Sequence, residues 1–209
     1  MRTVNSPFDK IEKLRDSVIQ HGPSSDRIYL MKAAKSDGAV LPQALLKIAK
    51  QMGYSKIFAK IPENLTDSFE SAGYREEATI PGYFNGKASC HMVSCFLNPE
   101  RALETRESVV RDVLHTALNI PVLKGEPDPL PANHTLRLMT HDDTPQMATV
   151  YRQVFASYPF PIHDPAYLKD TMDSHIRYFG VLEDEELIAL ASCEMDLESA
   201  AVEMTDFAT

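Results

Sequence analysis

The sequence lacks both an excess of basic residues and any long hydrophobic run. It carries 21 Lys and Arg against 30 Asp and Glu, with a formal net charge of −9 and a pI of about 5.2. Nucleic-acid binding usually needs a basic stripe that neutralises phosphates, so no nucleic-acid partner is expected. No stretch is long and apolar enough to span a membrane, and the start, MRTVNSPFDK, lacks the apolar core of a secretory signal. These absences predict a cytoplasmic protein without a membrane partner.

Cysteine is scarce, which excludes a disulfide framework. The three cysteines are Cys90, Cys95 and Cys193. Cys90 and Cys95 are five positions apart, so on one strand they point to opposite faces. We therefore expect reduced, structural thiols and not metal ligands. Three histidines, His141, His163 and His175, are also too far apart in the sequence to have the spacing of a metal site.

What the sequence does contain is ordinary for globular α/β proteins. Hydrophobic residues make up 44% and charged residues 24% of its 209 residues, enough for one large domain or two small ones. Four prolines fall within NIPVLKGEPDPLPANH, residues 119–134. Proline-rich segments are stiff and extended, so we expect a linker there, between one unit at 1–118 and another at 135–209.

The first unit is predicted to begin with a helix at 7–20, because apolar residues recur there at helical spacing. The elements expected after it are a strand at 26–34, a helix at 42–52, a strand at 55–62, a helix at 64–72, strands at 75–84 and 88–97, and a helix from 98 to about 118. Asn85 and Gly86 join the two last strands and form a typical hairpin turn. The apolar face expected for the last helix consists of Leu103, Val110, Val113, Leu114 and Ala117.

The second unit is predicted to run strand, helix, helix, strand, strand, strand. The strands are expected at 135–140, 176–183, 186–195 and 201–208, and the helices start near Asp143 and Pro165. In the last strand Val202 and Met204 alternate with Glu203, which predicts a buried strand that carries a carboxylate. The strand ends in mid-pattern, so we expect that the chain is incomplete.

This order of elements resembles the acetyltransferases of the GNAT superfamily. The second unit is similar to the N-terminal half of a GNAT domain, and the first unit is similar to a C-terminal half. The resemblance implies an α/β fold, with a GNAT-like mixed sheet and flanking helices. In that family the fourth strand leads into a loop that binds the pyrophosphate of acetyl-CoA at a helix N-terminus. Phe69 stands where many members have a tyrosine that acts as general acid.

More specifically, the chain resembles the β-lysine N-acetyltransferases. The matching stretches are SDRIYLMK (25–32), GYSKIFAKIP (53–62), IPGYFNG (80–86), YPFPIHDP (158–165), YFGV (178–181) and EMTDFAT (203–209). The resemblance implies transfer of an acetyl group from acetyl-CoA to the side-chain amine of β-lysine, which yields the compatible solute Nε-acetyl-β-lysine. It implies acetyl-CoA as co-substrate, a small-molecule amine as acceptor and no metal.

The resemblance also implies site residues. Glu203 and Asp206 are candidates for the general base, since the attacking amine must lose a proton; alternatively, Glu203 faces solvent and Asp206 makes a turn contact. Glu194 is a candidate for holding the ammonium group of the acceptor. The loop 158–164 is either the acceptor side of the cleft or a rigid connector, and its candidates are Tyr158, Phe160, Ile162 and His163. The candidates for binding acetyl-CoA through their main chain are Phe207, Ala208 and Thr209.

A different function class stays open. The chain is alternatively a non-catalytic, degenerate acetyltransferase module for dimerisation or ligand sensing, and a homodimer is possible in either case. Because the pyrophosphate loop would follow residue 209, we expect weak binding of acetyl-CoA by this chain. We also expect the edge of the strand 201–209 to be covered by another chain or by strands of the first unit, since bare strand edges promote association.

Overall fold

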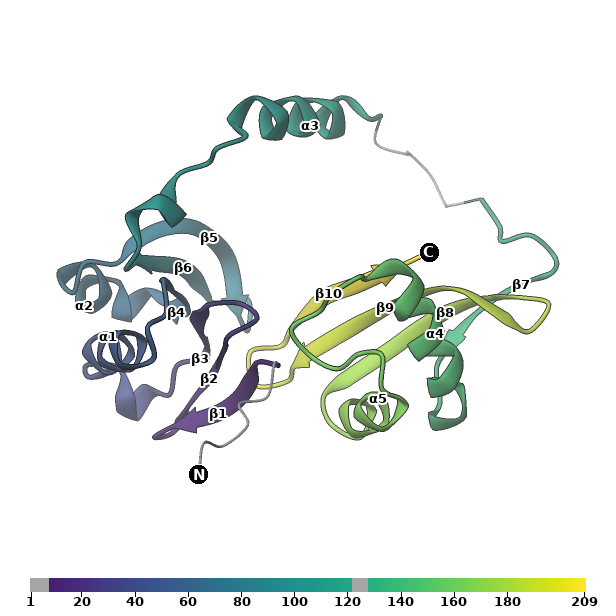
Figure 1. Cartoon of the computed structure of the whole chain (residues 1–209), viewed down its shortest axis with the longest axis horizontal. Helices are drawn as coiled ribbons and strands as arrows, with labels where there is room; N and C mark the ends of the chain where they lie inside the picture. The colour runs from purple at the N-terminus through teal and green to yellow at the C-terminus, as the bar shows by residue number, and fades with distance from the viewer. Residues whose placement is uncertain (1–7, 122–127) are drawn as a thin grey trace.

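A computed structural model describes residues 8–121 and 128–209, and its strands form two sheets (Figure 1). The first is six-stranded, in the order β1-β2-β3-β4-β6-β5, and the second is four-stranded, in the order β10-β9-β8-β7. In the first sheet β3 and β4 run parallel, whereas the other neighbouring strands run antiparallel. The predicted α/β fold with a mixed sheet and flanking helices is confirmed.

The first sheet and its helices follow the predicted order from residue 26 to residue 97. Its strands are β1 (Lys10–Leu14), β2 (Ser17–Gly22), β3 (Arg27–Lys32), β4 (Lys56–Pro62), β5 (Arg75–Phe84) and β6 (Ala88–Phe96). Its helices are α1 (Leu41–Met52) and α2 (Thr66–Ser71), with short 3-10 turns at Lys35–Asp37 and Glu63–Leu65. Gly53 ends α1 with a φ of 75°, a conformation that glycine adopts without strain.

The helix predicted at 7–20 is wrong in its described part, residues 8–20. The chain there forms the hairpin β1–β2, with Arg15 at a φ of 57° in the turn. The carboxylate of Asp37 accepts hydrogen bonds from the backbone N–H of Asp16 and of Ser17, both at 3.0 Å. The bonds to Asp37 span 20 and 21 residues, and β2 also pairs with β3 on its other side, so the local spacing of apolar residues did not reveal the hairpin. Residue 7 lies outside the described residues.

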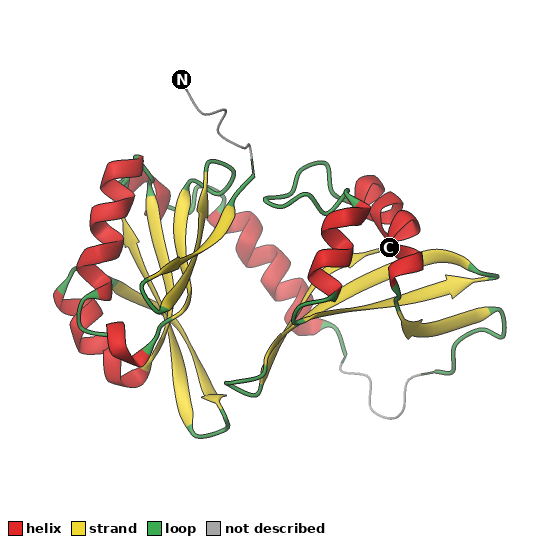
Figure 2. Cartoon of the chain, turned by 90° about the horizontal axis from the view of Figure 1, so that it is seen from below, coloured by secondary structure: helices red, strands yellow, loops and turns green. Residues whose placement is uncertain are grey.

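The core of the first unit lies between one face of its sheet and the helices α1 and α2 (Figure 2). Leu45 and Ala49 on α1 are fully buried against Ile28 and Ile57 on the strands. Phe69 on α2 is also fully buried and packs edge-on against Tyr74, with ring centroids 4.9 Å apart. Phe69 is thus a core residue of this unit.

The predicted hairpin turn at Asn85 and Gly86 is confirmed. Both residues have positive φ, 56° and 69°, as type I′ hairpins require. The turn also touches the second unit. The backbone N–H of Asn85 donates to the carbonyl of Ser199 at 2.7 Å, and its side-chain amide donates to the carbonyl of Glu198 at 2.9 Å.

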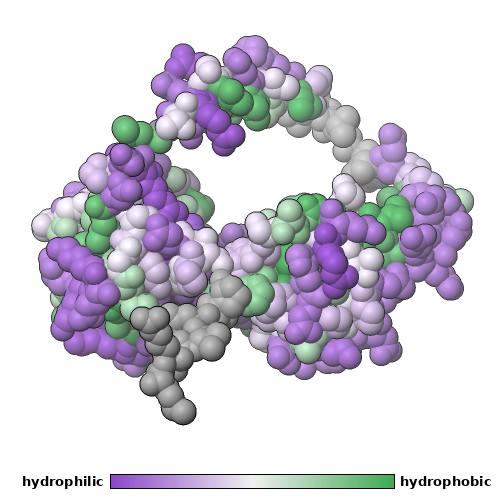
Figure 3. All heavy atoms as spheres, in the orientation of Figure 1, coloured by the Kyte–Doolittle hydropathy of each residue, from purple (hydrophilic) through white to green (hydrophobic). Residues whose placement is uncertain are grey.

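The helix predicted from 98 to 118 is interrupted, and the burial predicted for it is wrong. A 3-10 turn (Pro99–Ala102) is followed by an extended stretch, and α3 begins at Glu107 and ends at Asn119. Figure 1 shows α3 standing away from both sheets, and Figure 3 shows hydrophobic side chains on its surface. Leu103 is 71% exposed and Val113 is 63% exposed. The spacing of apolar residues predicted α3, but the apolar face of this helix has no packing partner within the described residues.

The second sheet has the predicted order of elements. Its strands are β7 (His134–Leu138), β8 (Ile176–Glu183), β9 (Glu186–Asp196) and β10 (Ala201–Ala208), with a 3-10 turn at His141–Asp143 and the helices α4 (Thr144–Val154) and α5 (Pro165–Met172). Its core includes Met147 and Tyr151 on α4, Leu168 on α5 and Tyr178 on β8. Residues 122–127 of the expected linker lie outside the described residues.

The strand predicted at 201–208 is present, but it is an edge strand and is largely exposed. Val202 and Met204 are 57% and 62% exposed, and Ala208 is the buried residue of this strand. In the described part of the chain β10 pairs with β9 and with no strand of the first unit, so the expectation that those strands cover its edge is wrong. The alternation of apolar and polar residues predicted the strand, but it does not show whether another element covers either face of that strand.

We expect Phe69→Ala to destabilise the protein by about 3–5 kcal/mol, because it removes a fully buried aromatic ring and leaves a cavity. Leu114→Ala is the matched control on α3, where the side chain is 56% exposed, and should cost about 0.5 kcal/mol or less. Urea unfolding of both variants checks this. Similar losses in the two variants would contradict the assignment of the core.

Candidate active site

A cavity of about 410 Å³ lies between the two units, within the range of about 300–1,000 Å³ that is typical of small-ligand sites. The first unit lines it with Ile11, Val18, Met31, Lys32, Lys60 and Tyr83. The second unit lines it with His175, Glu194, Met195, Asp196, Leu197, Glu198 and Glu203. The cavity thus brings together Glu194 and Glu203, two of the residues predicted from the sequence.

Glu194 and Glu203 are direct cross-strand partners on β9 and β10. Glu194 is partly buried, whereas Glu203 is exposed. Burial raises the pKa of Glu194 above its ordinary value, the carboxylates of Glu203 and Asp206 raise it further, and Lys60 partly opposes the rise. Two neighbouring carboxylates repel each other unless a cation lies near them, so this pair favours a cationic ligand.

The first unit contributes the cation Lys60 and the phenol of Tyr83 to the same cavity, and Tyr29 lies beside Lys60. Lys60 lies on β4 with its Nζ 5.6 Å and 5.7 Å from the ring centroids of Tyr29 and Tyr83, and it donates to the hydroxyl of Tyr83 at 3.4 Å. Burial raises the pKa of Tyr29, with Lys60 opposing that rise and Glu203 adding to it. Lys60 and Glu203 are therefore within electrostatic reach of the same phenol.

The structure adds residues that the sequence analysis missed, above all Lys60 and Tyr83. A signal was available in the alternation of Lys56, Phe58 and Lys60 along β4, opposite the buried Ile57. His175, which the sequence analysis did not expect to bind a metal, is exposed and also lines the cavity.

Asp206 lies outside this cavity, in a β-bulge. Thr205 is paired with Ser192 and Ala208 with Leu190, so two residues of β10 lie opposite one residue of β9. The φ of Asp206 is 55°, a region that aspartate tolerates better than most residues. Its carboxylate accepts hydrogen bonds from the hydroxyl of Tyr158 and from Ser192 Oγ, the latter at 2.9 Å. These bonds hold the bulge in one conformation.

Several tyrosines surround Asp206 and Glu194 on the helix side of the sheet. Burial raises the pKa of Tyr178 to about 12; a hydrogen bond with Thr171 opposes this rise, and Asp206 and Glu194 add to it. Burial is also the main cause that raises the pKa of Tyr158 and of Tyr167. These phenols therefore remain protonated at neutral pH and can donate hydrogen bonds.

The loop 158–164 packs on the core of the second unit. Ile162 is 3% exposed, and the ring of Phe160 stacks on Tyr167 with centroids 6.2 Å apart. The Nε2 atom of His163 is buried without a hydrogen-bond partner among the described residues. The predicted residues of this loop do not line the cavity between the units.

Of the three residues predicted to bind acetyl-CoA, Phe207 and Ala208 end β10, and Thr209 follows it. Phe207 and Thr209 are exposed and Ala208 is buried. Because β10 is an edge strand in the described part of the chain, its outer backbone groups pair with no neighbouring strand there. Such groups can bind an extended ligand through main-chain hydrogen bonds.

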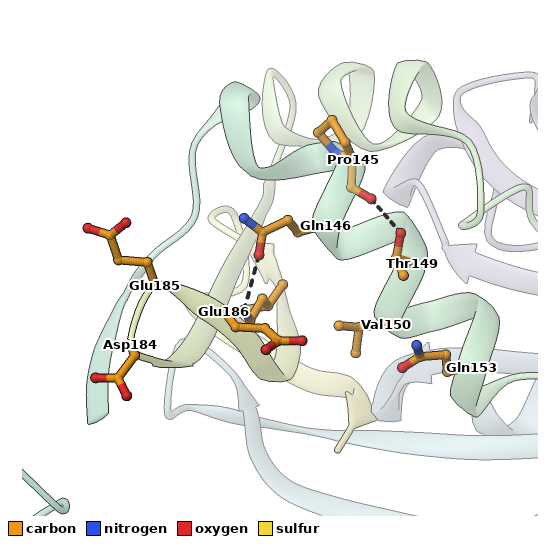
Figure 4. A pocket seen from close by; sticks show the side chains of 9 residues that line it. Pro145, Gln146, Thr149, Val150, Gln153, Asp184, Glu185 and Glu186 are labelled. Carbon is orange, nitrogen blue, oxygen red and sulfur yellow. Dashed lines mark hydrogen bonds between the residues drawn. The ribbon is translucent and has the colours of Figure 1, made fainter. Parts of the chain in front are cut away.

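A second hollow, of about 600 Å³, lies between α4 and the β8–β9 turn (Figure 4). None of the predicted site residues lines it. Two of its polar groups are already engaged: Gln146 Oε1 accepts from the backbone N–H of Leu187 at 3.1 Å, and Thr149 donates to the carbonyl of Pro145 at 3.0 Å. We therefore place the candidate active site between the units.

Within residues 8–121 and 128–209, no group of three or more His, Cys, Asp and Glu is arranged to hold a metal ion. None of the described helices has the length and apolar character needed to cross a membrane.

We expect Glu194→Gln to stabilise the protein at neutral pH. The raised pKa keeps a proton on Glu194 in the folded state at pH values where the unfolded chain has released it, so stability falls as the pH rises above about 4.5. The glutamine side chain does not ionise, so the variant does not lose stability in this way. The gain in Tm of Glu194→Gln over the wild type should therefore be near zero at about pH 4 and grow toward neutral pH. Thermal unfolding across this range checks it. Glu70→Gln, an exposed position on α2, is the control, and an equal gain there would contradict the interpretation.

No family model matches the chain, but sequence comparisons find relatives. The chain is 32% identical over 201 residues to a beta-lysine N(6)-acetyltransferase of Methanococcus maripaludis, covering 96% of this chain and 72% of that protein. It is 31% identical over 185 residues to a beta-lysine N(6)-acetyltransferase of Methanosarcina mazei, covering 79% of this chain and 68% of that protein.

A solved structure supports the fold. The C-terminal domain of a protein named as a lysylphosphatidylglycerol synthetase, from Agrobacterium fabrum, matches 97% of this chain and 61% of its own length, with a TM-score of 0.51 and 12% identity. At this identity the likeness concerns the fold alone. On the sequence matches, which cover 96% and 79% of the chain, the protein belongs to the family of β-lysine N6-acetyltransferases.

Proposed function

We propose that the protein transfers an acetyl group from acetyl-CoA to the side-chain amine of β-lysine, and that it does so in the synthesis of the compatible solute Nε-acetyl-β-lysine. The observation that carries this proposal is the cross-strand pair Glu194 and Glu203, which faces the cavity between the units. The names of the relatives from Methanococcus and Methanosarcina supply the acceptor.

The carboxylate pair binds the cationic side chain of the acceptor. Glu194 is partly buried and holds the ammonium group, while Glu203 is exposed and exchanges protons with water. Glu203 removes a proton from the ammonium, directly or through a water molecule, because only the neutral nitrogen is nucleophilic. The nitrogen then attacks the thioester carbonyl carbon, the C–N bond forms, the C–S bond breaks and CoA leaves with a proton. No covalent enzyme intermediate is needed.

The edge strand β10 positions acetyl-CoA. The free backbone groups at Phe207, Ala208 and Thr209 bind the pantetheine arm as a neighbouring strand would. The bulge at Asp206 turns this edge, and its hydrogen bonds to Tyr158 and Ser192 fix the direction in which the arm runs. Asp206 is therefore proposed as a positioning residue rather than as the base, with the packed loop 158–164 supporting it through Tyr158.

The proposed architecture has two units, residues 1–118 and 135–209, joined by the proline-rich segment 119–134, whose first and last residues end α3 and begin β7. The separate hydrophobic clusters of the two sheets support this division. The exposed apolar side chains of α3 and of β10 are compatible with a homodimer. A non-catalytic, ligand-sensing module is the second candidate, and it predicts binding of the acceptor without turnover.

We expect Glu203→Gln to lower kcat/KM for β-lysine about 100-fold, because the amide cannot accept the proton. Release of CoA, followed across a range of pH values, measures this. Glu186→Gln at the other end of the same sheet is the control and should leave the kinetics unchanged, since Glu186 lies outside the cavity. A wild-type pH profile in Glu203→Gln would remove Glu203 from the mechanism. A larger loss of kcat in Glu194→Gln would assign the role of base to Glu194 instead.

A further inference from the structure

Lys60 is the partly buried cation that faces the carboxylate pair. It lies on β4 of the first unit, and its side chain passes between the rings of Tyr29 and Tyr83. No carboxylate of the described residues lies within ion-pair distance of its ammonium group. Its electrostatic influence nevertheless reaches Glu194 in the second unit. Among the described residues, the cavity therefore has one unpaired cation on the first unit, opposite the carboxylate pair Glu194 and Glu203 of the second unit, which also contributes Asp196 and Glu198.

The neighbouring lysines differ from Lys60 because each of them is paired with a carboxylate. Lys32 also lines the cavity, but its ammonium group is paired with Glu198 and is largely exposed. Lys56, on the same face of β4, is 3.3 Å from Glu77 and does not line the cavity. A cation that is fixed by aromatic rings and partly removed from water binds an anion more strongly than an exposed, paired lysine.

We propose that Lys60 binds the carboxylate of the acceptor, so that the first unit selects a diamino acid over a simple diamine. The inference rests on the proposed function, because it concerns the same cavity. β-lysine carries its carboxylate at one end and its side-chain ammonium at the other. With the ammonium on Glu194 and Glu203, the carboxylate extends toward the opposite wall, where Lys60 and the hydroxyl of Tyr83 lie.

This arrangement gives the first unit a role in specificity. A diamine without a carboxylate leaves Lys60 unpaired and still satisfies the two glutamates. Selectivity against such a diamine therefore depends on the ion pair between the carboxylate and Lys60. Without a carboxylate, the partly buried charge of Lys60 remains uncompensated. Tyr29 and Tyr83 act through Lys60: their rings restrict the lysine side chain and reduce the entropy that is lost when it binds an anion.

Calorimetric titration with three acceptors tests the inference. These are β-lysine, its carboxamide and decarboxylated β-lysine. Wild-type protein should bind β-lysine at least about tenfold more tightly than either analogue that lacks the carboxylate, as a charge-assisted hydrogen bond implies. Lys60→Met keeps an apolar side chain beside the rings and should remove this preference. The affinity for β-lysine should fall about tenfold, whereas decarboxylated β-lysine should bind as before or more tightly. Lys60→Arg should retain most of the preference.

Lys56→Met is the matched control, because it removes a cation from the same face of β4 outside the cavity; it should leave the preference intact. A preference that persists in Lys60→Met overturns the proposal, as does an equal loss of affinity for all three acceptors or the absence of a preference in the wild type. The proposed function fails separately: if the wild type prefers β-lysine but releases no CoA in its presence, Lys60 still binds the carboxylate and the protein is a sensing module.

Discussion

The contact between two hairpin turns determines the geometry of the site. The turn at Asn85 in the first unit donates two hydrogen bonds to carbonyls of the β9–β10 turn, at Glu198 and Ser199. Near this contact, the ion pair between Lys32 and Glu198 also joins the units. The cavity exists because these contacts place one face of the first sheet beside the ends of β9 and β10. A change at this contact would move Lys60 relative to Glu194 without altering either unit's core.

The distribution of charge explains why the cavity favours a zwitterionic ligand. Glu194 and Glu203 are direct cross-strand neighbours, and burial raises the pKa of Glu194. Placing two carboxylates together is unfavourable in the absence of a ligand, and this cost is relieved when an ammonium group binds. Lys60 opposes the rise in that pKa from the other unit. Each unit thus supplies the charge that the other lacks, and a ligand with both charges satisfies both.

The edge strand β10 combines two features that ordinary sheet strands avoid. It has a bulge at Asp206, and its outer edge has no strand beside it in the described part of the chain. Bulges disrupt pairing and turn a strand, so they are frequent next to active sites. Here Tyr158 and Ser192 stabilise the bulge through the Asp206 carboxylate. The backbone next to the carboxylate pair is therefore rigid and available to a ligand, whereas its outward side chains at Val202 and Met204 are exposed.

The sequence by itself determined the α/β class, the strands and helices from 26 to 97 and from 134 to 208, and the turn at Asn85, because periodicity, capping and turn residues act over a few positions. Glu194 and Glu203 were named from the resemblance to acetyltransferases, and their roles stay a prediction. Only the tertiary structure decided the rest. The segment 10–22 became a hairpin through bonds to Asp37, α3 and β10 were left exposed, and Lys60 came to face Glu194. These outcomes depend on which faces meet, and contacts between distant segments leave no periodic pattern in either one.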